Sequence, residues 1–446
     1  MCWRPPTGRL DTTSLPAPDS LSPATMHSLP GPHDVTRHTL PNGITVLARE
    51  NMNSPSVVVD ASIHAGSIYE GRTHAGLANF TATMLMRGTA NASFDQIHER
   101  IESVGASLGS SCGVHTAGFS GKALAEDLDM LLASAADLVR NPTFPSDHVE
   151  RIRGETLTGM AMRAHNTRAM AALTFYEALF GYDHPYGYSN DGYPDTVEKL
   201  TRQELKQFQR KHYGPQEMIV VIVGSVAAQT AIKLIEKHFG DWSNKKQPAR
   251  APAPAERALN GRINRQVHIA GKTQTDIMLG FFGPCRSDPD FQAVRVANNI
   301  LGVFGMMGRL GDNVRTKRGL AYYSFSHADG SFGPGTWRLI AGVNPDKVDT
   351  AIAAMLAEIE RLVSRLVTPT ELADSTSFIL GRLPLQLETN EGVAGTLAAI
   401  ELHGLGLDYL QRLPEQIHAL TRADIRRAAG RLLDSEKYVL AVAGPE

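Results

Sequence analysis

Cysteine is scarce in this sequence: Cys2, Cys112 and Cys285 are the three cysteines among 446 residues. Three widely spaced thiols exclude a disulfide framework and a site in which four thiolates bind one metal ion. Scarce cysteine is typical of proteins that work in a reducing compartment. We therefore expect a cytoplasmic protein whose thiols stay reduced.

An excess of basic residues is also absent. The chain has 44 Lys and Arg against 46 Asp and Glu, which gives a formal net charge of −2. Proteins that hold nucleic acid mainly by neutralising its phosphates carry a clear basic excess. We expect no nucleic-acid partner.

Long apolar runs are absent as well. The most apolar window, residues 218–228 (MIVVIVGSVAA), is well short of the ~20 residues that a membrane-spanning helix needs. Its β-branched residues predict a buried strand, and we expect no membrane partner. Residues 1–36 lack the apolar core of a signal peptide and are interrupted by Pro and Ser, so we predict a disordered leader there, with Met26 as an alternative start.

The remaining chain is 42% hydrophobic and 20% charged, a balance that allows sizeable buried cores in roughly two to four domains. Asn42-Gly43 lies between two β-prone stretches and predicts a tight hairpin, because both residue types tolerate positive φ. Alternation over 56–65 predicts a further strand. Helical patterns cover the ranges 76–87, 123–139, 149–163, 205–212 and 228–239.

Three features recur in the same order along the chain. Leu200-Thr201-Arg202 returns as Leu420-Thr421-Arg422, and the glycine that closes VVIVG at 224 returns as the glycine that closes VLAVAG at 444. Leu138-Val139 and Pro145 return as Leu362-Val363 and Pro369. A common helix start would explain the first match, since Thr is a frequent N-cap, but not the shared spacing. We predict two homologous α+β domains, 37–241 and 263–446, joined by the proline-spaced linker 242–262.

The string at 76–89 (GLANFTATMLMRGT) resembles the zinc helix of the pitrilysin family, the inverted zincins, which include insulysin and the mitochondrial processing peptidases. Members of that family read G-L-A-H-F-L-E-H-M-x-F-x-G-T. Two His four residues apart share one helix face and can bind one Zn²⁺, while the Glu between them accepts a proton from the metal-bound water. The family's third ligand is a Glu farther along the chain.

This sequence departs from the family pattern at each of these chemical positions. Asn79 and Thr83 stand at the His positions, Ala82 stands at the position of the base, and Gly159 stands at that of the third ligand. Neutral Asn and Thr are poor zinc ligands, and Ala and Gly supply no functional group. The apolar frame of the helix is retained. We therefore expect no metal and no other cofactor in this chain.

The string at 314–322 (VRTKRGLAY) resembles the family's L-R-E-K-R-G-L-A-Y. The resemblance implies that Arg315 and Tyr322 match an Arg and a Tyr that face the zinc of the other half and hydrogen-bond the substrate near its scissile carbonyl. A guanidinium and a phenol can both stabilise the negative charge of a tetrahedral intermediate. Residue types alone favour a basic surface run and a packed strand Tyr, but the matched string around them favours the catalytic interpretation.

The resemblance covers about residues 37–446. It implies an α+β fold of two homologous domains, each a mostly antiparallel sheet packed against helices, that together form half of a clamshell chamber. It also implies a heterodimeric peptide hydrolase: a zinc-binding subunit of the same family would supply His, His, Glu and zinc, and this chain would supply Arg315 and Tyr322. The alternative is a catalytically silent structural or assembly subunit. The segment 107–116 resembles the family's peptide-binding edge strand, and an ordinary sheet edge explains it equally well.

Overall fold

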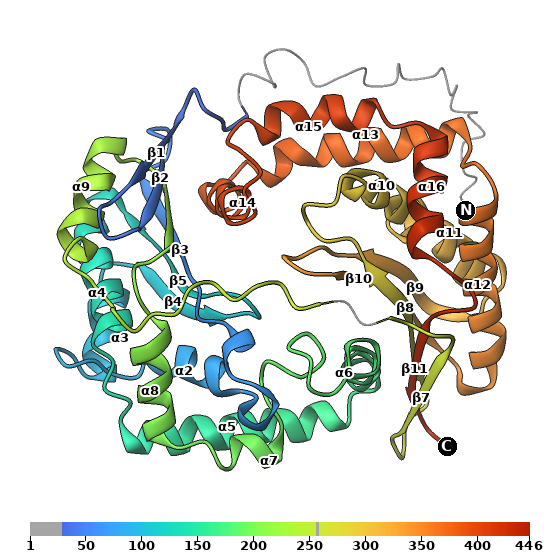
Figure 1. The fold of residues 1–446 in the computed structure, drawn as a ribbon, viewed down its shortest axis with the longest axis horizontal. Coiled ribbons are helices and arrows are strands. Elements are labelled where there is room, and N and C mark those ends of the chain that lie inside the picture. The colour runs from blue at the N-terminus through green and yellow to red at the C-terminus, as the bar shows by residue number, and fades with distance from the viewer. Residues whose placement is uncertain (1–28, 256–257) are drawn as a thin grey trace, which may run out of the picture.

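The computed structural model describes residues 29–255 and 258–446 (Figure 1). The predicted leader 1–36 is wrong for residues 29–36. Leu29 is only 2% exposed and packs in the hydrophobic core of the C-terminal half, where the Gln411 side-chain amide donates hydrogen bonds to the carbonyls of Leu29 and Pro30 at 3.2 and 3.1 Å. Residues 1–28, with Cys2 and Met26, lie outside the described residues.

The N-terminal half (residues 29–240) is built on a six-stranded sheet with the order β1-β2-β6-β3-β5-β4. Its pairs are antiparallel except for the parallel pair β2 and β6. The elements are β1 (Val35–Thr39), β2 (Thr45–Glu50), β3 (Ser56–Ile63), α2 (Leu77–Leu85), α3 (Phe94–Glu102), β4 (Ser107–Cys112), β5 (Ala117–Leu124), α4 (Leu128–Arg140), α5 (Ser146–Ala164), α6 (Thr167–Phe180), α7 (Pro194–Val197), α8 (Arg202–His212), β6 (Ile219–Gly224) and α9 (Ala228–Phe239).

The C-terminal half (residues 258–446) is built on a five-stranded sheet with the order β7-β11-β8-β10-β9. Here β7 and β11 form the parallel pair. The elements are β7 (Ile263–His268), β8 (Thr275–Gly283), α10 (Phe291–Gly302), α11 (Phe304–Leu310), the short helical segment η4 (Gly311–Lys317), β9 (Ala321–Ala328), β10 (Gly335–Val343), α12 (Val348–Ser364), α13 (Pro369–Gln386), α14 (Asn390–Leu402), α15 (Tyr409–His418), α16 (Arg422–Leu432) and β11 (Val439–Gly444).

The two sheets share one plan, as the internal repeat predicts. Strands β2-β6-β3-β5-β4 of the first sheet correspond in order and direction to β7-β11-β8-β10-β9 of the second. The repeated Leu-Thr-Arg begins α8 and α16, whose Thr201 and Thr421 side chains cap the helix in reciprocal hydrogen bonds with Glu204 and Asp424. The α+β fold class is confirmed, while the domain bounds 37–241, 242–262 and 263–446 stay a prediction.

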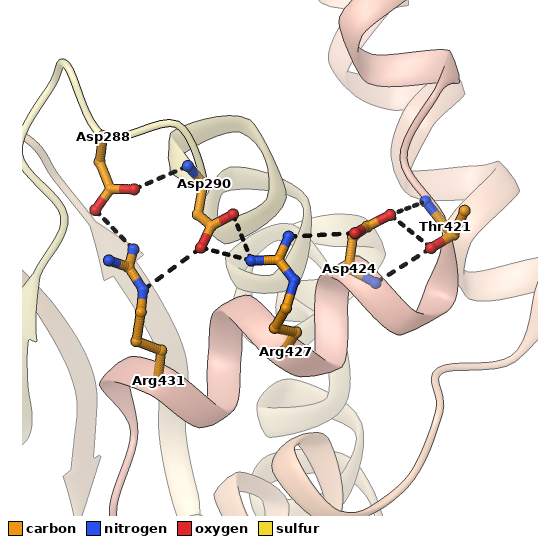
Figure 2. Close-up of polar contacts among 6 residues, drawn as sticks. All are labelled: Asp288, Asp290, Thr421, Asp424, Arg427 and Arg431. Carbon is orange, nitrogen blue, oxygen red and sulfur yellow. Dashed lines mark hydrogen bonds and ion pairs between the residues drawn. The ribbon is translucent and has the colours of Figure 1, made fainter.

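Figure 2 shows how α16 is held against the segment that precedes α10. Arg427 binds Asp290 at 2.8 Å, and Arg431 binds Asp288 at 2.6 Å. Arg427 also reaches Asp424, the capping residue of its own helix, at 3.2 Å. The carboxylates of Asp288 and Asp290 are therefore committed to guanidinium groups of α16.

The two halves exchange one helix each. Helix α14 of the C-terminal half places Val393 and Leu397 against Leu47, Val58 and Val221 of the first sheet. Helix α6 of the N-terminal half packs in turn against β8, β10 and β11 of the second sheet. Figure 1 shows both helices between the two sheets. Each sheet thus has one face covered by its own helices and the other covered by the opposite half.

Two local predictions have different outcomes. The hairpin at Asn42-Gly43 is confirmed: β1 and β2 pair antiparallel, and Gly43 has φ +96°. The predicted helix 123–139 is wrong at its start, because Ala123 and Leu124 continue β5 and pair with β3, so that α4 begins at Leu128. Within 29–255 and 258–446, no helix is long and apolar enough to cross a bilayer.

Candidate functional site

Helix α2 carries the residues of the degenerate zinc motif and is fixed at its first turn. Gly76 precedes the helix with φ +98°, and a Cβ at this position would lie 2.7 Å from the Asp191 carbonyl oxygen. The Glu70 carboxyl accepts the N–H groups of Gly76 at 2.9 Å and Ala78 at 2.6 Å, which satisfies two free donors of the helix end. Burial raises the pKa of Glu70 to about 8, although these N–H groups oppose the shift.

The side chain at the first His position belongs to a polar network with α5 and the loop after α6. The Asn79 amide donates to Asp191 at 3.1 Å. Asp191 also accepts a hydrogen bond from Arg163 of α5 at 3.1 Å, and Arg163 reaches Ser189 at 3.2 Å. The polar groups around Asn79 thus satisfy one another without a metal ion.

The other three motif positions offer no metal ligand. Thr83 turns its hydroxyl back onto the Asn79 carbonyl at 3.0 Å. Ala82 is 1% exposed, and its carbonyl accepts a hydrogen bond from Ser110 of strand β4 at 2.7 Å. Gly159 lies on α5 with open space around its Cα. These residues do not fit the zinc that the family pattern implies, because they present one amide, one occupied hydroxyl and no imidazole or carboxylate.

The described part of the chain offers no other metal site. There, no three His, Cys, Asp or Glu side chains are grouped so that they could hold a metal ion. The apolar frame of the motif nevertheless packs as the sequence predicts: Phe80, Met84 and Leu85 are all buried in the core of the N-terminal half.

Arg315 lies on η4, a tight helical segment that leads into β9. Its neighbours in the basic run are engaged: Lys317 pairs with Asp312 at 2.6 Å, and Arg318 donates to Asn313 at 2.9 Å. The half-buried Arg315 side chain makes no ion pair and no hydrogen bond with any residue of 29–255 and 258–446. It is therefore available to an outside acceptor.

Tyr322 lies near the start of β9, the edge strand of the second sheet. Its side chain is 61% exposed, so this phenol does not fill a core. The next residue, Tyr323, faces the opposite side, where it packs against α6 and donates to Asp276. The structure thus carries Arg315 and Tyr322 on consecutive segments and records no bond between them in the described chain.

A cavity of about 390 Å³ lies between the two halves. Aromatic side chains of the N-terminal half and residues 329–336 of the C-terminal half line it. Tyr186 joins the halves here, because its hydroxyl bonds to His115 at 2.5 Å and accepts the Gly333 N–H at 3.1 Å. Burial and the charge of Arg250 lower the pKa of His115 to about 4, so this imidazole is neutral at pH 7.

Sequence reasoning did not identify Glu70, Arg163 or Asp191 as parts of this site. Asp191 is 112 residues away from Asn79 along the chain, and nothing in its local sequence marks it. A partial signal existed for Arg163, which follows Gly159 by one helical turn on α5 and therefore shares its face.

Two models of known protein families match this chain. The family model described as "Insulinase (Peptidase family M16)" matches residues 45–182, and the one described as "Peptidase M16 inactive domain" matches residues 199–376. The first match contains α2 with its altered motif, and the second contains Arg315 and Tyr322.

Relatives in other organisms match most of this chain. A Mycobacterium tuberculosis protein named an uncharacterized zinc protease is 29% identical over 409 residues, covering 92% of this chain and 93% of its own length. A probable mitochondrial-processing peptidase subunit beta of Arabidopsis thaliana is 22% identical, covering 91% of this chain and 78% of its own.

Among solved structures, the peptidase M16 inactive domain from Pseudomonas fluorescens superposes with a TM-score of 0.85 at 26% identity, over 93% of this chain and 98% of that one. A protease from Helicobacter pylori shares the fold, with a TM-score of 0.87 at 23% identity, over 94% of this chain and 100% of that one. With both halves of its fold matched, the chain belongs to the M16 (insulinase) peptidase family, the pitrilysin family that its motifs resemble.

Proposed function

We propose that this chain is the zinc-free subunit of a two-chain peptidase that hydrolyses peptides. A partner of the same family supplies the two His, the Glu and the zinc, and this chain supplies Arg315 and Tyr322. One contrast carries the proposal: the Asn79 side chain donates an internal hydrogen bond to Asp191, whereas Arg315 has no internal partner in the described chain and Tyr322 is exposed.

The chemistry assigned to the pair is transition-state stabilisation. Attack of water on a peptide carbonyl places negative charge on the carbonyl oxygen. Arg315 would donate N–H hydrogen bonds that carry a full positive charge, and the Tyr322 hydroxyl would donate a neutral one. Neither group is asked to activate the water, which the partner's zinc site would do.

Two features support a peptide as the substrate. Strands β4 and β9 each lie at an edge of their sheet, so each leaves one row of backbone donors and acceptors for an extended chain. The cavity between the halves is lined largely by aromatic and small residues. Enclosure between two such chains favours unfolded peptides over folded proteins.

We also propose that this chain assembles with a partner chain and that it works in the cytoplasm. A relative is named a processing-peptidase subunit, which supports assembly with a second chain. The free thiols of Cys112 and Cys285 support a reducing compartment.

The test is a peptide-cleavage assay on the chain alone and on its complex with a zinc-binding family member that carries H-x-x-E-H. We expect no cleavage by the chain alone. In the complex, Arg315→Ala should lower kcat/KM by about 10²-fold, as loss of an oxyanion donor does elsewhere, and Tyr322→Phe by about 10-fold. The matched control is Arg318→Ala, which removes an Arg of the same segment whose side chain is bound to Asn313 and should change turnover less than twofold.

Two results would contradict the proposal. Cleavage by the purified chain without a partner would refute the division of labour. Unchanged turnover in both Arg315→Ala and Tyr322→Phe would assign the chain to the alternative class, a structural or assembly subunit that takes no part in the reaction.

A further inference from the structure

Two adjoining cavities of about 310 and 570 Å³ lie in the C-terminal half, apart from Arg315 and Tyr322. Helices α10 and α13 line both of them, and α14 and α15 close the smaller one. Three arginines border these cavities: Arg286 the smaller, Arg382 the larger and Arg295 both. We call this pair of spaces the arginine cavity.

Arg295 borders both cavities and is less exposed than Arg382. It lies in the middle of α10, and neither an ion pair nor a hydrogen bond to its side chain occurs within the described residues. Burial lowers its pKa, and the positive charges of Arg286 and Arg382 lower it further. The Arg295 side chain is partly exposed and no carboxylate of the described chain pairs with it, so its guanidinium is available to an anion from solvent.

The carboxylates near the cavity do not pair with these arginines. Asp288 and Asp290, which follow Arg286 closely in the chain, are bound by Arg431 and Arg427 of α16 (Figure 2). Asp329, which follows the cavity residue Ala328, is bound by Arg338 at 2.9 Å. The carboxylates of Asp288, Asp290 and Asp329 are thus bound by arginines that do not line the cavity.

The remaining lining residues also suit an anion. Arg286 donates to the Tyr409 hydroxyl at 2.8 Å and stacks 4.2 Å from the Phe291 ring, so its guanidinium is held in place. The buried Asn299 amide nitrogen has no partner in the described chain and supplies a further donor. Arg382 and Leu385 are exposed and mark a route from solvent.

We propose that the arginine cavity binds an anionic group, a carboxylate or a phosphate, between Arg295 and Arg382. The group belongs either to an acidic side chain of a bound peptide or to a small phosphate compound. If it belongs to a peptide substrate, an assignment that rests on the proposed function, its position follows from β9. Ala328 is six residues beyond Tyr322 on that strand, or about 20 Å at ~3.3 Å per residue, so the acid would lie well away from the bond that is cut.

The test is isothermal titration of the full-length chain without any partner. The probes are sodium phosphate, a blocked peptide with two glutamates, and the same peptide with two glutamines. We expect saturable binding of phosphate, of the glutamate peptide, or of both, and none of the glutamine peptide. Arg295→Met and Arg382→Gln should each weaken that binding at least fivefold.

The matched control is Arg365→Gln, which removes an exposed arginine at the end of α12, outside the cavity. It should leave the affinity unchanged. Arg382 is exposed, so its replacement should not disturb folding, and a cooperative thermal unfolding transition in each variant would show that both are folded. The glutamate peptide and phosphate distinguish the two sources of the anion.

Failure to bind either anion, or binding that survives in both cavity variants, would overturn the proposal. Because the measurement needs neither a partner nor catalysis, its failure would leave the proposed peptidase role standing, and failure of the cleavage assay would leave the anion site standing.

Discussion

Single side chains decide what the zinc-like helix can do. In α2 the polar atoms of Asn79 and Thr83 are turned toward Asp191 and the helix backbone. Arg163, a cation, lies on the far side of Asp191 and neutralises it. A metal ion would have to displace these bonds and would gain no charged ligand from the four motif positions. Where the family pattern has zinc ligands, this chain has a hydrogen-bonded network.

The ion pair between Arg309 and Glu371 shows how single side chains also affect stability. It joins the end of α11 to the first turn of α13 at 2.7 Å, and the Arg309 side chain is 7% exposed. Burial by itself would raise the pKa of Glu371. The hydrogen bond from Arg309 and the Thr368 N–H outweigh burial and lower this pKa to about 2.

Removal of the Glu371 carboxylate should make the free energy of unfolding less dependent on pH. A group whose pKa is lower in the folded state contributes its full stability above its unfolded pKa of ~4.3 and loses it as pH falls toward 2. Glu371→Gln should therefore cost about 1–2 kcal/mol at pH 6, after allowance for solvent screening, and less at pH 3. Urea unfolding at both pH values measures this difference. Glu360→Gln, at an exposed carboxylate of α12, is the control, and an equal cost at both pH values would contradict the assignment.

At the scale of elements, glycines set where helices can begin and how closely they approach the chain. Gly76 adopts φ +98° beside the Asp191 carbonyl, so both its backbone and its lack of a side chain are needed. Gly159 is an exposed residue within α5 and has no neighbouring atom within 4 Å of a Cβ position. The same residue type thus has opposite consequences at two positions of the degenerate motif region.

Alanine at these two positions should shift stability in opposite directions. Gly76→Ala should lower the free energy of unfolding by roughly 2–4 kcal/mol, because it adds a clash with backbone to an unfavourable φ. Gly159→Ala should raise it by about 0.5–1 kcal/mol through better helix propensity. Thermal and urea unfolding of the two variants provide the comparison. A lower free energy of unfolding in Gly159→Ala would contradict the open surroundings of this position on α5.

Local pattern was a good guide to most elements and a poor one to the contacts between them. The apolar spacing of α2 and the Asn42-Gly43 turn were predictable because each depends on neighbours a few residues away. The start of α4 was not, because Ala123 and Leu124 gain more from pairing with β3 than from helical hydrogen bonds. Asn79, Ala82, Thr83 and Gly159 could be located by motif, but their partners Asp191 and Arg163 could not.

At the scale of the whole molecule, the internal repeat predicted two similar halves. It did not predict that each half packs one helix on the sheet of the other. Helices α6 and α14 occupy equivalent places in the two repeats, after α5 and α13 respectively. Each nevertheless packs on the sheet of the other half. The segment around Leu29 adds a further crossing, since it lies in the C-terminal core while β1 pairs in the N-terminal sheet. No local period in the sequence encodes such a crossing, because its contacts join residues hundreds of positions apart.

The first turn of α14 is the polar centre of this exchange. Asn390 is 6% exposed, and its carbonyl oxygen accepts a hydrogen bond from the Asn51 amide at 2.8 Å. Its own amide donates to the Ser56 carbonyl at 3.3 Å, at the start of β3. The adjacent Glu391 pairs with Lys122 of β5 at 2.6 Å, but both of those side chains are about half exposed.

Loss of the buried amide should loosen the two halves far more than loss of the exposed ion pair. Asn390→Ala removes the acceptor of the Asn51 amide and one of the two donors to the Ser56 carbonyl, and should lower the free energy of unfolding by about 1–3 kcal/mol. Glu391→Gln, one residue away at the same interface, should cost under about 1 kcal/mol because solvent screens the pair. Hydrogen exchange should speed up at the start of β3 and in the first turn of α14 in Asn390→Ala alone. Equal exchange in the two variants would show that apolar packing of Val393 and Leu397, and not the amide, holds α14 to the first sheet.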